Sequence, residues 1–390
     1  MAKRVCVVTS TRADWGLLQP LALLLRNDAD VELSIVATNM HLMPRFGHTV
    51  DEIEAAGFTV DAKVHMDVVG DDGESRVRAM ACCLDGMAKT FTRLRPDVVI
   101  ILGDRYEMLG VASAAAVMSI PIVHIAGGEI SEGAVDDSIR HAITKLSSLH
   151  LTATEEYRNR VIQLGEDPEM VVNTGAIGVY NAMNVEPIGI DDLEKSLCIR
   201  LKGHRVAVVT YHPATNDIGA TPAERVKALL LALDRFPDLQ LVITYPNNDA
   251  GGESLIPLLE HYAEENSGRV CLIPSLGMSR YLSMLRVACM VVGNSSSGIV
   301  EVPSCGIPTV DIGIRQRGRM AAESVIHCGD SVEEISAAIA KAGTSEFRQI
   351  AAQCHNPYFK PDTPAIMLAA IKGFLGKLPL SPKKFRDIRL

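Results

Sequence analysis

The sequence has no excess of basic residues and no long apolar run, and each absence disfavours a class of function. The 390-residue chain carries a formal net charge of -9. This charge disfavours a nucleic-acid partner, because such binding depends on Lys and Arg that neutralise many phosphates. No apolar stretch approaches the roughly 20 residues that a helix needs to cross a bilayer, so we expect no membrane span.

Paired cysteine motifs are also missing. The nine cysteines are scattered and form neither a CxxC pair nor a Cys/His group with zinc spacing. We therefore expect reduced thiols and no metal site. The N-terminal residues run directly into a strand-like segment, Arg4 to Val8, without the features of a signal peptide. These features predict a cytoplasmic protein.

The length and composition of the chain favour two globular domains. At 390 residues the chain exceeds the size at which a single hydrophobic core usually stops growing. Hydrophobic residues make up 47% of it and charged residues 22%, as in ordinary soluble domains. We expect domains at residues 1–180 and 205–376, a linker at 181–204 and a tail at 377–390.

The first half alternates short β-branched apolar runs with segments of helical periodicity, which is typical of βαβ units in a parallel sheet. The predicted strands are Val5 to Thr9, Val31 to Ala37, Val98 to Leu102, Ile120 to Ile125 and His150 to Ala153. The predicted helices are Leu17 to Arg26, Glu74 to Leu94, Met108 to Met118, Asp136 to Leu146 and Glu155 to Leu164.

The same pattern restarts after the stretch 181–203. The second set of predicted strands is Arg205 to Thr210, Leu239 to Thr244, Val270 to Ile273, Cys289 to Val292 and Thr309 to Ile312, and Pro361 to Leu375 is a predicted terminal helix. The sequence therefore predicts an α/β protein with two Rossmann-like, doubly wound domains. We expect its ligand at the carboxyl ends of the strands, in a cleft between the domains.

Two strand-to-helix turns have the composition of anion sites. The turn around Arg12 lacks the glycine-rich dinucleotide fingerprint, which argues against a nicotinamide or flavin cofactor. A helix N-terminus with an Arg beside it binds anions, but an Arg12–Asp14 pair that only caps the helix is equally consistent. The turn Gly293–Gly298 offers Ser295 and Ser296 to a diphosphate, although a serine-rich turn is often only a helix cap.

Charged residues near the second turn suit a nucleotide. Glu301 follows the serine turn, where it can accept hydrogen bonds from ribose hydroxyls, and Arg315 opens a basic loop after a later strand. His212 and Asn247 also follow strands of the second domain and are expected to contact the ligand.

Acidic residues follow two strands of the first domain. Asp104 ends one strand, Glu129 follows the next, and Asp136 opens the helix after it. Carboxylates crowded at one sheet edge raise one another's pKa, as general acid/base chemistry near neutral pH requires. The alternative is that these residues serve only as helix caps and loop residues.

Taken together, these segments resemble the hydrolysing UDP-N-acetylglucosamine 2-epimerase family. The resemblance runs from the N-terminus to about Arg319 and rests on short motifs whose order and spacing are specific. They are Thr11-Arg12-Ala13-Asp14, Gly103-Asp104-Arg105, Gly127-Gly128-Glu129, Asp136-Asp137-Ser138-Ile139-Arg140-His141, His212-Pro213, Gly293-Asn294-Ser295-Ser296 and Arg315-Gln316.

The resemblance implies a GT-B fold, with the nucleotide held mainly by the second domain and the sugar by the first. It assigns the acid/base roles to Asp104, Glu129 and Asp136, without deciding between acid and base, because many relatives carry a glutamate where this chain has Ala126. Arg105 is expected to face the phosphates or the sugar. The implied nucleotide contacts are Arg12, His212, Ser295, Ser296, Glu301 and Arg315.

The implied reaction converts UDP-N-acetylglucosamine and water to N-acetylmannosamine and UDP, through anti elimination to a glycal and hydration, for the biosynthesis of a sialic-type acid. It needs no cofactor and no metal. The resemblance also implies a homodimer or homotetramer. Three alternatives remain: a 2-epimerase of nucleotide-linked N,N'-diacetylbacillosamine in legionaminic acid synthesis, a GT-B glycosyltransferase, and a nonenzymatic sugar-nucleotide sensor.

Overall fold

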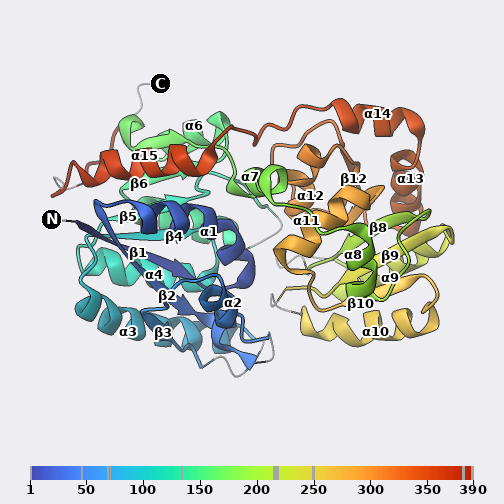
Figure 1. Cartoon of the computed structure of the whole chain (residues 1–390), viewed down its shortest axis with the longest axis horizontal. Coiled ribbons are helices and arrows are strands. Elements are labelled where there is room, and N and C mark those ends of the chain that lie inside the picture. The colour runs from blue at the N-terminus through green and yellow to red at the C-terminus, as the bar shows by residue number, and fades with distance from the viewer. Residues whose placement is uncertain are drawn as a thin grey trace. The chain divides into compact units, whose positions relative to one another are not determined.

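The protein consists of two compact units (Figure 1). A computed structural model describes residues 2–44, 47–67, 70, 72–132, 135–213, 219–247, 251–379 and 383–387. Unit 1 comprises Met1–Glu129, Asp136–Tyr180 and Lys360–Leu390, and unit 2 comprises Ile130–Val135 and Asn181–Phe359.

Unit 1 is built on a seven-stranded parallel sheet in the order β3-β2-β1-β4-β5-β6-β7. Its strands are β1 (Lys3–Thr9), β2 (Val31–Thr38), β3 (Ala62–Val64), β4 (Val98–Leu102), β5 (Ile122–Ile125), β6 (Leu149–Thr152) and β7 (Val171–Asn173). Its helices are α1 (Arg12–Asn27), α2 (Val50–Ala55), α3 (Gly73–Leu94), α4 (Tyr106–Val117), α5 (Asp136–Leu146), α6 (Glu155–Gln163) and α15 (Thr363–Leu375), with 3-10 turns at Asn39–Leu42 and Pro168–Met170.

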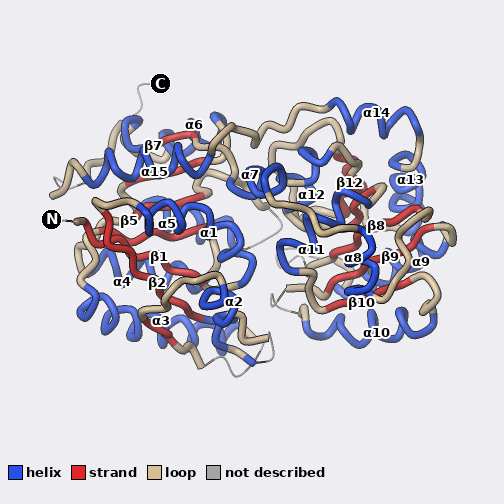
Figure 2. Tube along the Cα trace, viewed as in Figure 1, coloured by secondary structure: helices blue, strands red, loops and turns tan. Residues whose placement is uncertain are grey.

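Alternate residues of β1 enter two different cores, because successive strand side chains point to opposite faces of a sheet. Val5 and Val7 pack with apolar side chains of α1, α2 and α15, whereas Cys6 and Val8 pack with those of α3, α4 and α5. Helices therefore cover both faces of the sheet, and Figure 2 shows its strands in red between them. This is the doubly wound arrangement that the near-continuous apolar strands predict.

Unit 2 repeats this plan with a six-stranded parallel sheet in the order β10-β9-β8-β11-β12-β13. Its strands are β8 (Arg205–Thr210), β9 (Leu239–Thr244), β10 (Val270–Ile273), β11 (Met290–Gly293), β12 (Thr309–Ile312) and β13 (Val325–Cys328). Its helices are α8 (Ile190–Leu197), α9 (Pro222–Asp234), α10 (Ile256–Glu265), α11 (Gly277–Val287), α12 (Ser297–Val300), α13 (Val332–Ala342) and α14 (Ser345–Gln353), with 3-10 turns at Glu253–Leu255 and Val302–Cys305. Helix α7 (Ile177–Asn184) contains the boundary between the two units, which falls after Tyr180.

Each sheet reverses its strand order once, between β1 and β4 in unit 1 and between β8 and β11 in unit 2. Ligands of open α/β sheets bind beyond the carboxyl ends of the strands at such a reversal. The residues after β1, β4, β8 and β11 are therefore the first places to look for a site.

The division of the chain differs from the predicted one at its C-terminal end. Residues 360–390 belong to unit 1 rather than unit 2. Helix α15 packs on α1, where Lys372 pairs with Asp28 at 2.7 Å and Asp30 at 2.9 Å. The segment 181–204, predicted as a linker, belongs to unit 2, because α8 buries Leu193 and Leu197 in its core.

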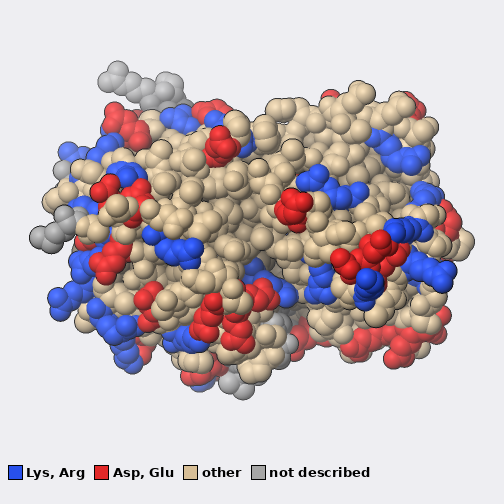
Figure 3. All heavy atoms as spheres, viewed as in Figure 1, with Lys and Arg blue, Asp and Glu red and all other residues tan. Residues whose placement is uncertain are grey.

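Two surface features bear on the predicted partners. Along the described parts of the chain, no helix combines the length and apolarity needed to cross a membrane. On the face shown in Figure 3, acidic and basic side chains are interspersed over both units.

Candidate active site

The turn after β1 is stabilised by the residues around Arg12. Thr11 caps α1 by accepting from the N–H of Asp14 (3.2 Å), and Asp14 accepts from the N–H of Thr11 (3.1 Å) and from the hydroxyl of Ser10 (2.6 Å). Burial raises the pKa of Asp14, although Arg105 and these hydrogen bonds act against it. Arg12 pairs with Glu52 at 3.3 Å and keeps 30% of its side chain exposed. The charged partner of Arg12 is thus Glu52 on α2, whereas Asp14 caps the helix.

Arg105 is paired with a buried carboxylate. Its Nε donates to Oε1 of Glu107 at 2.7 Å, and the Glu107 side chain is completely buried. Burial raises the pKa of Glu107, but the Arg105 guanidinium, with smaller contributions from Asn39 and Ser10, lowers it below its usual value. The guanidinium of Arg105 is thereby fixed beside the carboxyl end of β4.

Arg140 connects the predicted acidic residues. The side chain of this α5 residue is 1% exposed and pairs with Asp104, which follows β4. It also donates to the backbone carbonyl of Glu129 at 2.8 Å and to the carboxylate of Asp137 at 3.0 Å. Because a buried guanidinium is tolerated only when it is paired, these contacts fix the strand end, the loop after β5 and the start of α5 in one arrangement.

The loop that carries Glu129 is tightly packed. Glu129 is 7% exposed. Gly128 has φ +80°, and a Cβ there would lie 2.4 Å from the carbonyl oxygen of Tyr157, so no larger residue fits. Arg160 donates to the carbonyl of Gly128 at 2.6 Å. Asp136, the third predicted acid, is the first residue of α5 and is partly exposed.

His124 also holds the ends of β4 and β5 together. It is completely buried in β5, and its Nε2 donates to the carbonyl of Gly103 at 2.8 Å while its Nδ1 lies 3.2 Å from the hydroxyl of Thr144. Burial lowers the pKa of His124 to about 3. The ring is therefore neutral at physiological pH and joins the ends of β4 and β5 through hydrogen bonds.

In unit 2, Asn294 joins the loop after β8 to the turn after β11. Its side-chain oxygen accepts from the N–H of His212 at 2.7 Å, and its side-chain nitrogen donates to the carbonyl of His212 at 2.8 Å. Nδ1 of His212 accepts from the N–H of Asn247 at 3.0 Å, so the proton of the neutral ring is on Nε2. Gly293 lets the end of β11 lie close to the end of β8, since a Cβ there would lie 1.9 Å from the carbonyl oxygen of Thr210.

The serine turn opens a helix of a single turn. Ser295 and Ser296 are partly exposed, and α12 spans only Ser297–Val300, with Glu301 at its C-terminal boundary. A one-turn helix offers backbone N–H groups to an anion, but little macrodipole. The hydroxyl of Tyr281 lies 2.6 Å from that of Ser297. Burial raises the pKa of Tyr281, and the nearby Glu301 carboxylate raises it further.

The predicted basic loop divides into two parts. Arg315 and Gln316 donate to the backbone carbonyl of Asn294, at 3.3 Å and 2.9 Å. Arg317 and Arg319 line a pocket of about 730 Å³ at the ends of β12 and β13, together with Arg225 and several acidic side chains. Only the first part of the loop therefore contacts the serine turn through these bonds.

The structure thus groups the predicted residues into two sets, one in each unit. In unit 1, Arg140 links Asp104 to the Glu129 loop and to α5, which begins with Asp136. In unit 2, Asn294 links the loops of His212 and Asn247 to the turn of Ser295 and to Arg315. Three residues that hold these sets together have no role predicted from the sequence, although each follows a predicted strand end or lies on a predicted helix. They are Arg140, Asn294 and Glu107.

Comparison with known proteins identifies the family. Residues 24–372 match the family described as UDP-N-acetylglucosamine 2-epimerase. The chain belongs to this family. The resemblance that its motifs carry is therefore confirmed.

Relatives within the epimerase family cover most of the chain. A Campylobacter jejuni protein named GDP/UDP-N,N'-diacetylbacillosamine 2-epimerase (hydrolyzing) is 40% identical over 350 residues, 90% of each chain. The Escherichia coli polysialic acid biosynthesis protein P7 is 34% identical over 99% of this chain and 98% of its own. A Neisseria meningitidis UDP-N-acetylglucosamine 2-epimerase is 32% identical over 87% of each chain.

Solved structures of the family confirm the GT-B fold. The Neisseria meningitidis UDP-GlcNAc 2-epimerase bound to UDP-GlcNAc has a TM-score of 0.79 and 17% sequence identity, and the alignment covers 95% of this chain and all of that one. A putative UDP-N-acetylglucosamine 2-epimerase from Listeria monocytogenes also has a TM-score of 0.79, with 19% identity and full coverage of both chains. Within the described ranges, no group of three or more His, Cys, Asp or Glu residues is placed to hold a metal ion.

Proposed function

We propose that the protein is a hydrolysing 2-epimerase that acts on a nucleotide-linked 2-acetamido sugar. The observation that supports this most directly is the contact set of Arg140, which holds Asp104 and the Glu129 loop at one edge of the unit 1 sheet. Relatives named as hydrolysing 2-epimerases, at 40% and 34% identity, support the same reaction class.

Unit 1 supplies the acid/base groups in this proposal. One carboxylate among Asp104, Glu129 and Asp136 removes the proton from C2 while the C1–O bond breaks, and the electron pair of that bond leaves with the nucleotide. The product of this step is a glycal with a double bond between C1 and C2. Water then adds at C1 and a second acidic group delivers a proton to the opposite face of C2. The balance is one water consumed and one free, epimerised sugar formed.

Arg140 gives these carboxylates different environments. Asp104 faces a buried guanidinium, which favours the ionised form of its partner. An ionised carboxylate is the form that accepts a proton, so we assign Asp104 as the base. Glu129, whose loop is held by Arg140 and Arg160 through backbone carbonyls, is then the acid in the hydration step.

Unit 2 binds the nucleotide in this proposal. Backbone N–H groups of the serine turn and the guanidinium of Arg315 meet the diphosphate, whose negative charge grows as the C1–O bond breaks. The Nε2–H of His212 is a further donor, because Nδ1 is already held by Asn247. Glu301 accepts from the ribose hydroxyls. Arg12 and Arg105 in unit 1 add positive charge for the phosphates or the sugar.

Two substrates fit this chemistry. UDP-N-acetylglucosamine would give N-acetylmannosamine for a sialic-type acid. Nucleotide-linked N,N'-diacetylbacillosamine, a 2,4-diacetamido-6-deoxy sugar, is favoured by identity, since the Campylobacter jejuni relative with that name is 40% identical to this chain, against 34% for the polysialic acid biosynthesis protein P7 and 32% for the Neisseria enzyme.

The test is to incubate the purified protein with each nucleotide sugar and no acceptor, and to measure released nucleotide and free reducing sugar. We expect equal amounts of both, with the sugar epimerised at C2. Nucleotide release that requires an added acceptor would instead identify a glycosyltransferase. Tight nucleotide binding without release from any substrate would identify a sensor, and either result would overturn the proposal.

A further inference from the structure

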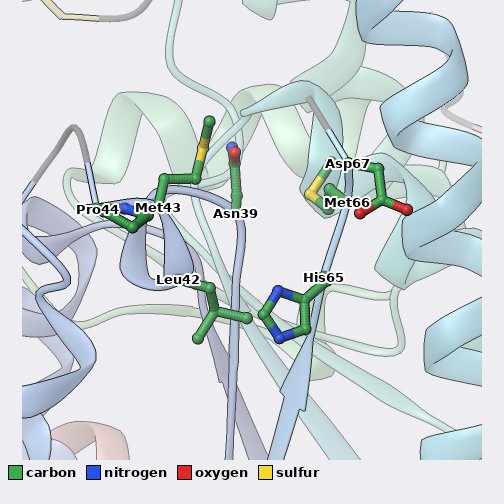
Figure 4. A pocket seen from close by; sticks show the side chains of 7 residues that line it. All are labelled: Asn39, Leu42, Met43, Pro44, His65, Met66 and Asp67. Atoms are coloured by element: carbon green, nitrogen blue, oxygen red, sulfur yellow. The ribbon is translucent and has the colours of Figure 1, made fainter. Parts of the chain in front are cut away.

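Contacts on two sides of unit 1 support the segments that carry the acid/base residues. At the carboxyl ends of β2 and β3, Asn39 lines a pocket of about 330 Å³ (Figure 4). Its amide interacts with Glu107 and Tyr106 at the start of α4, and Glu107 holds Arg105. Toward the opposite edge of the sheet, α5 and α6 are contacted by residues 383–387, which we call the C-terminal strap.

Lys383 of the C-terminal strap binds the C-terminal end of α5. Its Nζ donates to the backbone carbonyls of Lys145 and Ser147, each at 2.7 Å, and lies 3.4 Å from that of Thr144. The last carbonyls of a helix have no partner within the helix and form the negative end of its dipole, so a cation there is favourable. Lys383 therefore fixes the end of α5 that lies opposite Asp136, the first residue of the helix.

Lys383 also binds a buried carboxylate. Its Nζ lies 2.7 Å from Oε2 of Glu166, whose side chain is 2% exposed. Glu166 is further paired with Lys145 at 2.6 Å and with His150 at 3.0 Å. An ammonium has three N–H donors. The two carbonyls of α5 and this carboxylate account for all three, so they hold the Lys383 ammonium in one position.

The C-terminal strap also contacts the turn after α6. The backbone N–H of Arg386 donates to the carbonyl of Gly165 at 3.1 Å, and its guanidinium pairs with Asp167 at 2.7 Å. The ring of Phe385 lies against Gly165, where a Cβ would be 2.5 Å from the ring. Nζ of Lys145 lies 5.0 Å from the centre of the same ring. The strap thus connects the end of α5 to the end of α6.

These two helices hold the loop that carries Glu129. On α5, Arg140 contacts Asp104 and the backbone carbonyl of Glu129. On α6, Arg160 donates to the carbonyl of Gly128 at 2.6 Å. The C-terminal strap is therefore attached to both helices that fix the predicted acid/base residues.

Hydrogen bonds also lead from the C-terminal strap to the end of β4. Lys383 approaches the carbonyl of Thr144, and the Thr144 hydroxyl donates to Nδ1 of His124 at 3.2 Å. Nε2 of His124 donates to the carbonyl of Gly103, the residue before Asp104. A shift of the end of α5 would therefore reach Asp104 through His124 as well as through the helix itself.

The length of α5 sets the size of the expected effect. The helix has 11 residues and is therefore about 16 Å long. A tilt of roughly 4° about one end of such a helix moves the other end by about 1 Å. A displacement of about 1 Å can lower the rate of an enzyme by about 100-fold. Because Thr144 and Lys145 keep other contacts, loss of Lys383 should permit only part of this tilt.

We infer that the C-terminal strap positions the acid/base residues of unit 1, and that Lys383 is a positioning residue for the reaction, acting through α5. The inference rests on the proposed function and assigns a further residue to that reaction. A positioning role differs from a purely structural one because loss of Lys383 then lowers the turnover of molecules that stay folded.

The test compares nucleotide release by wild type and Lys383→Met, with nucleotide-linked N,N'-diacetylbacillosamine and UDP-N-acetylglucosamine as substrates. Every variant is a full-length chain, assayed where urea unfolding shows it to be folded. We expect kcat to fall by about 10-fold and KM to stay within about threefold, because the nucleotide contacts are proposed for unit 2. Lys383→Arg retains a cation with several donors and should bring kcat back to within about threefold of wild type.

Two variants serve as controls. Lys384→Met removes the same charge from the next residue, which is exposed, and should have wild-type kinetics. Glu166→Gln breaks the same ion pair as Lys383→Met but retains the bonds of Lys383 to α5. It should lose stability and keep kcat within about threefold of wild type.

Phe385→Ala tests the C-terminal strap without unpairing a charge. Because 67% of Phe385 is exposed, we expect little change in stability and a fall in kcat of about fivefold. Wild-type kcat in both Lys383→Met and Phe385→Ala, or an equal loss of kcat in Lys383→Met and either control, would overturn the positioning role. A wild type that releases nucleotide from neither substrate would instead overturn the proposed function.

Discussion

Replacing Arg140 is the perturbation with the largest expected effect on the unit 1 site. Its guanidinium is 1% exposed and contacts the carboxylates of Asp104 and Asp137 and the carbonyl of Glu129. Removing one partner of a fully buried ion pair costs about 3 to 5 kcal/mol. Because 24% of the Asp104 side chain and 28% of the Asp137 side chain are exposed, water can partly replace the cation. We therefore expect Arg140→Gln to lower the free energy of unfolding by roughly 2 to 3 kcal/mol.

We also expect substitution of Arg140 to lower the activity of the molecules that remain folded. Arg140→Lys retains the positive charge but replaces a planar fork by one ammonium, so it cannot hold all three acceptors at once. We expect kcat to fall at least about 100-fold in a protein that is still folded, because misplacing a catalytic group by about 1 Å has effects of this size. The assays are urea unfolding and nucleotide release at saturating substrate.

Arg158→Gln is the matched control for Arg140. Arg158 also bonds a backbone carbonyl and a carboxylate, those of Val171 at 2.9 Å and Glu155 at 3.0 Å, and it is not among the residues assigned to the site. We expect it to retain wild-type kcat. Wild-type turnover in Arg140→Lys would refute the reasoning, since the site would then not depend on the geometry of the guanidinium.

Three further predictions concern other groups. Asp104→Asn should abolish turnover and leave nucleotide affinity within about threefold of wild type in calorimetry, because the amide cannot accept the C2 proton; retained turnover would remove Asp104 from the chemistry. Arg315→Lys should weaken nucleotide binding by about 10-fold or more, since a bidentate fork is lost, and unchanged affinity in the same assay would contradict its assigned contact. Glu166 is 2% exposed and pairs with Lys145, His150 and Lys383. Burial raises its pKa, but these hydrogen bonds lower it to about 2, so the stability it contributes is present above its ordinary value of 4.5 and is lost as pH falls toward 2. Acid titration of the unfolding free energy should therefore show a difference between wild type and Glu166→Gln at pH 6 that shrinks below pH 4, and a constant difference would refute the assignment.

The sequence predicts the central elements of the fold well because their signal is local. Long apolar runs bounded by turns predict β8 as Arg205–Thr210 and β9 as Leu239–Thr244, with the bounds that the structure has. The prediction from sequence misses β3, β7 and β13, because these strands have only three or four residues and show no clear periodicity. It predicts the terminal helix but not its partner, because an amphipathic pattern shows that a face is buried and not which domain buries it.

For the candidate site too, local features can be predicted from the sequence and contacts between distant segments cannot. Polar residues at strand ends, such as Asp104 and His212, are visible because a strand-like run stops at them. The residues that hold them in place are not visible, because their contacts join segments that are far apart in sequence. Arg140 lies 36 residues from Asp104, and Asn294 lies 82 residues from His212.

The central claim is that the protein breaks the C2–H bond while it releases the nucleotide. The most direct measurement is proton NMR of the free sugar formed in D2O from nucleotide-linked N,N'-diacetylbacillosamine. We predict one deuterium at C2 of essentially every product molecule, in the inverted configuration and from the first turnovers. A free sugar that keeps its original C2 proton and configuration would mean simple hydrolysis and would contradict the account.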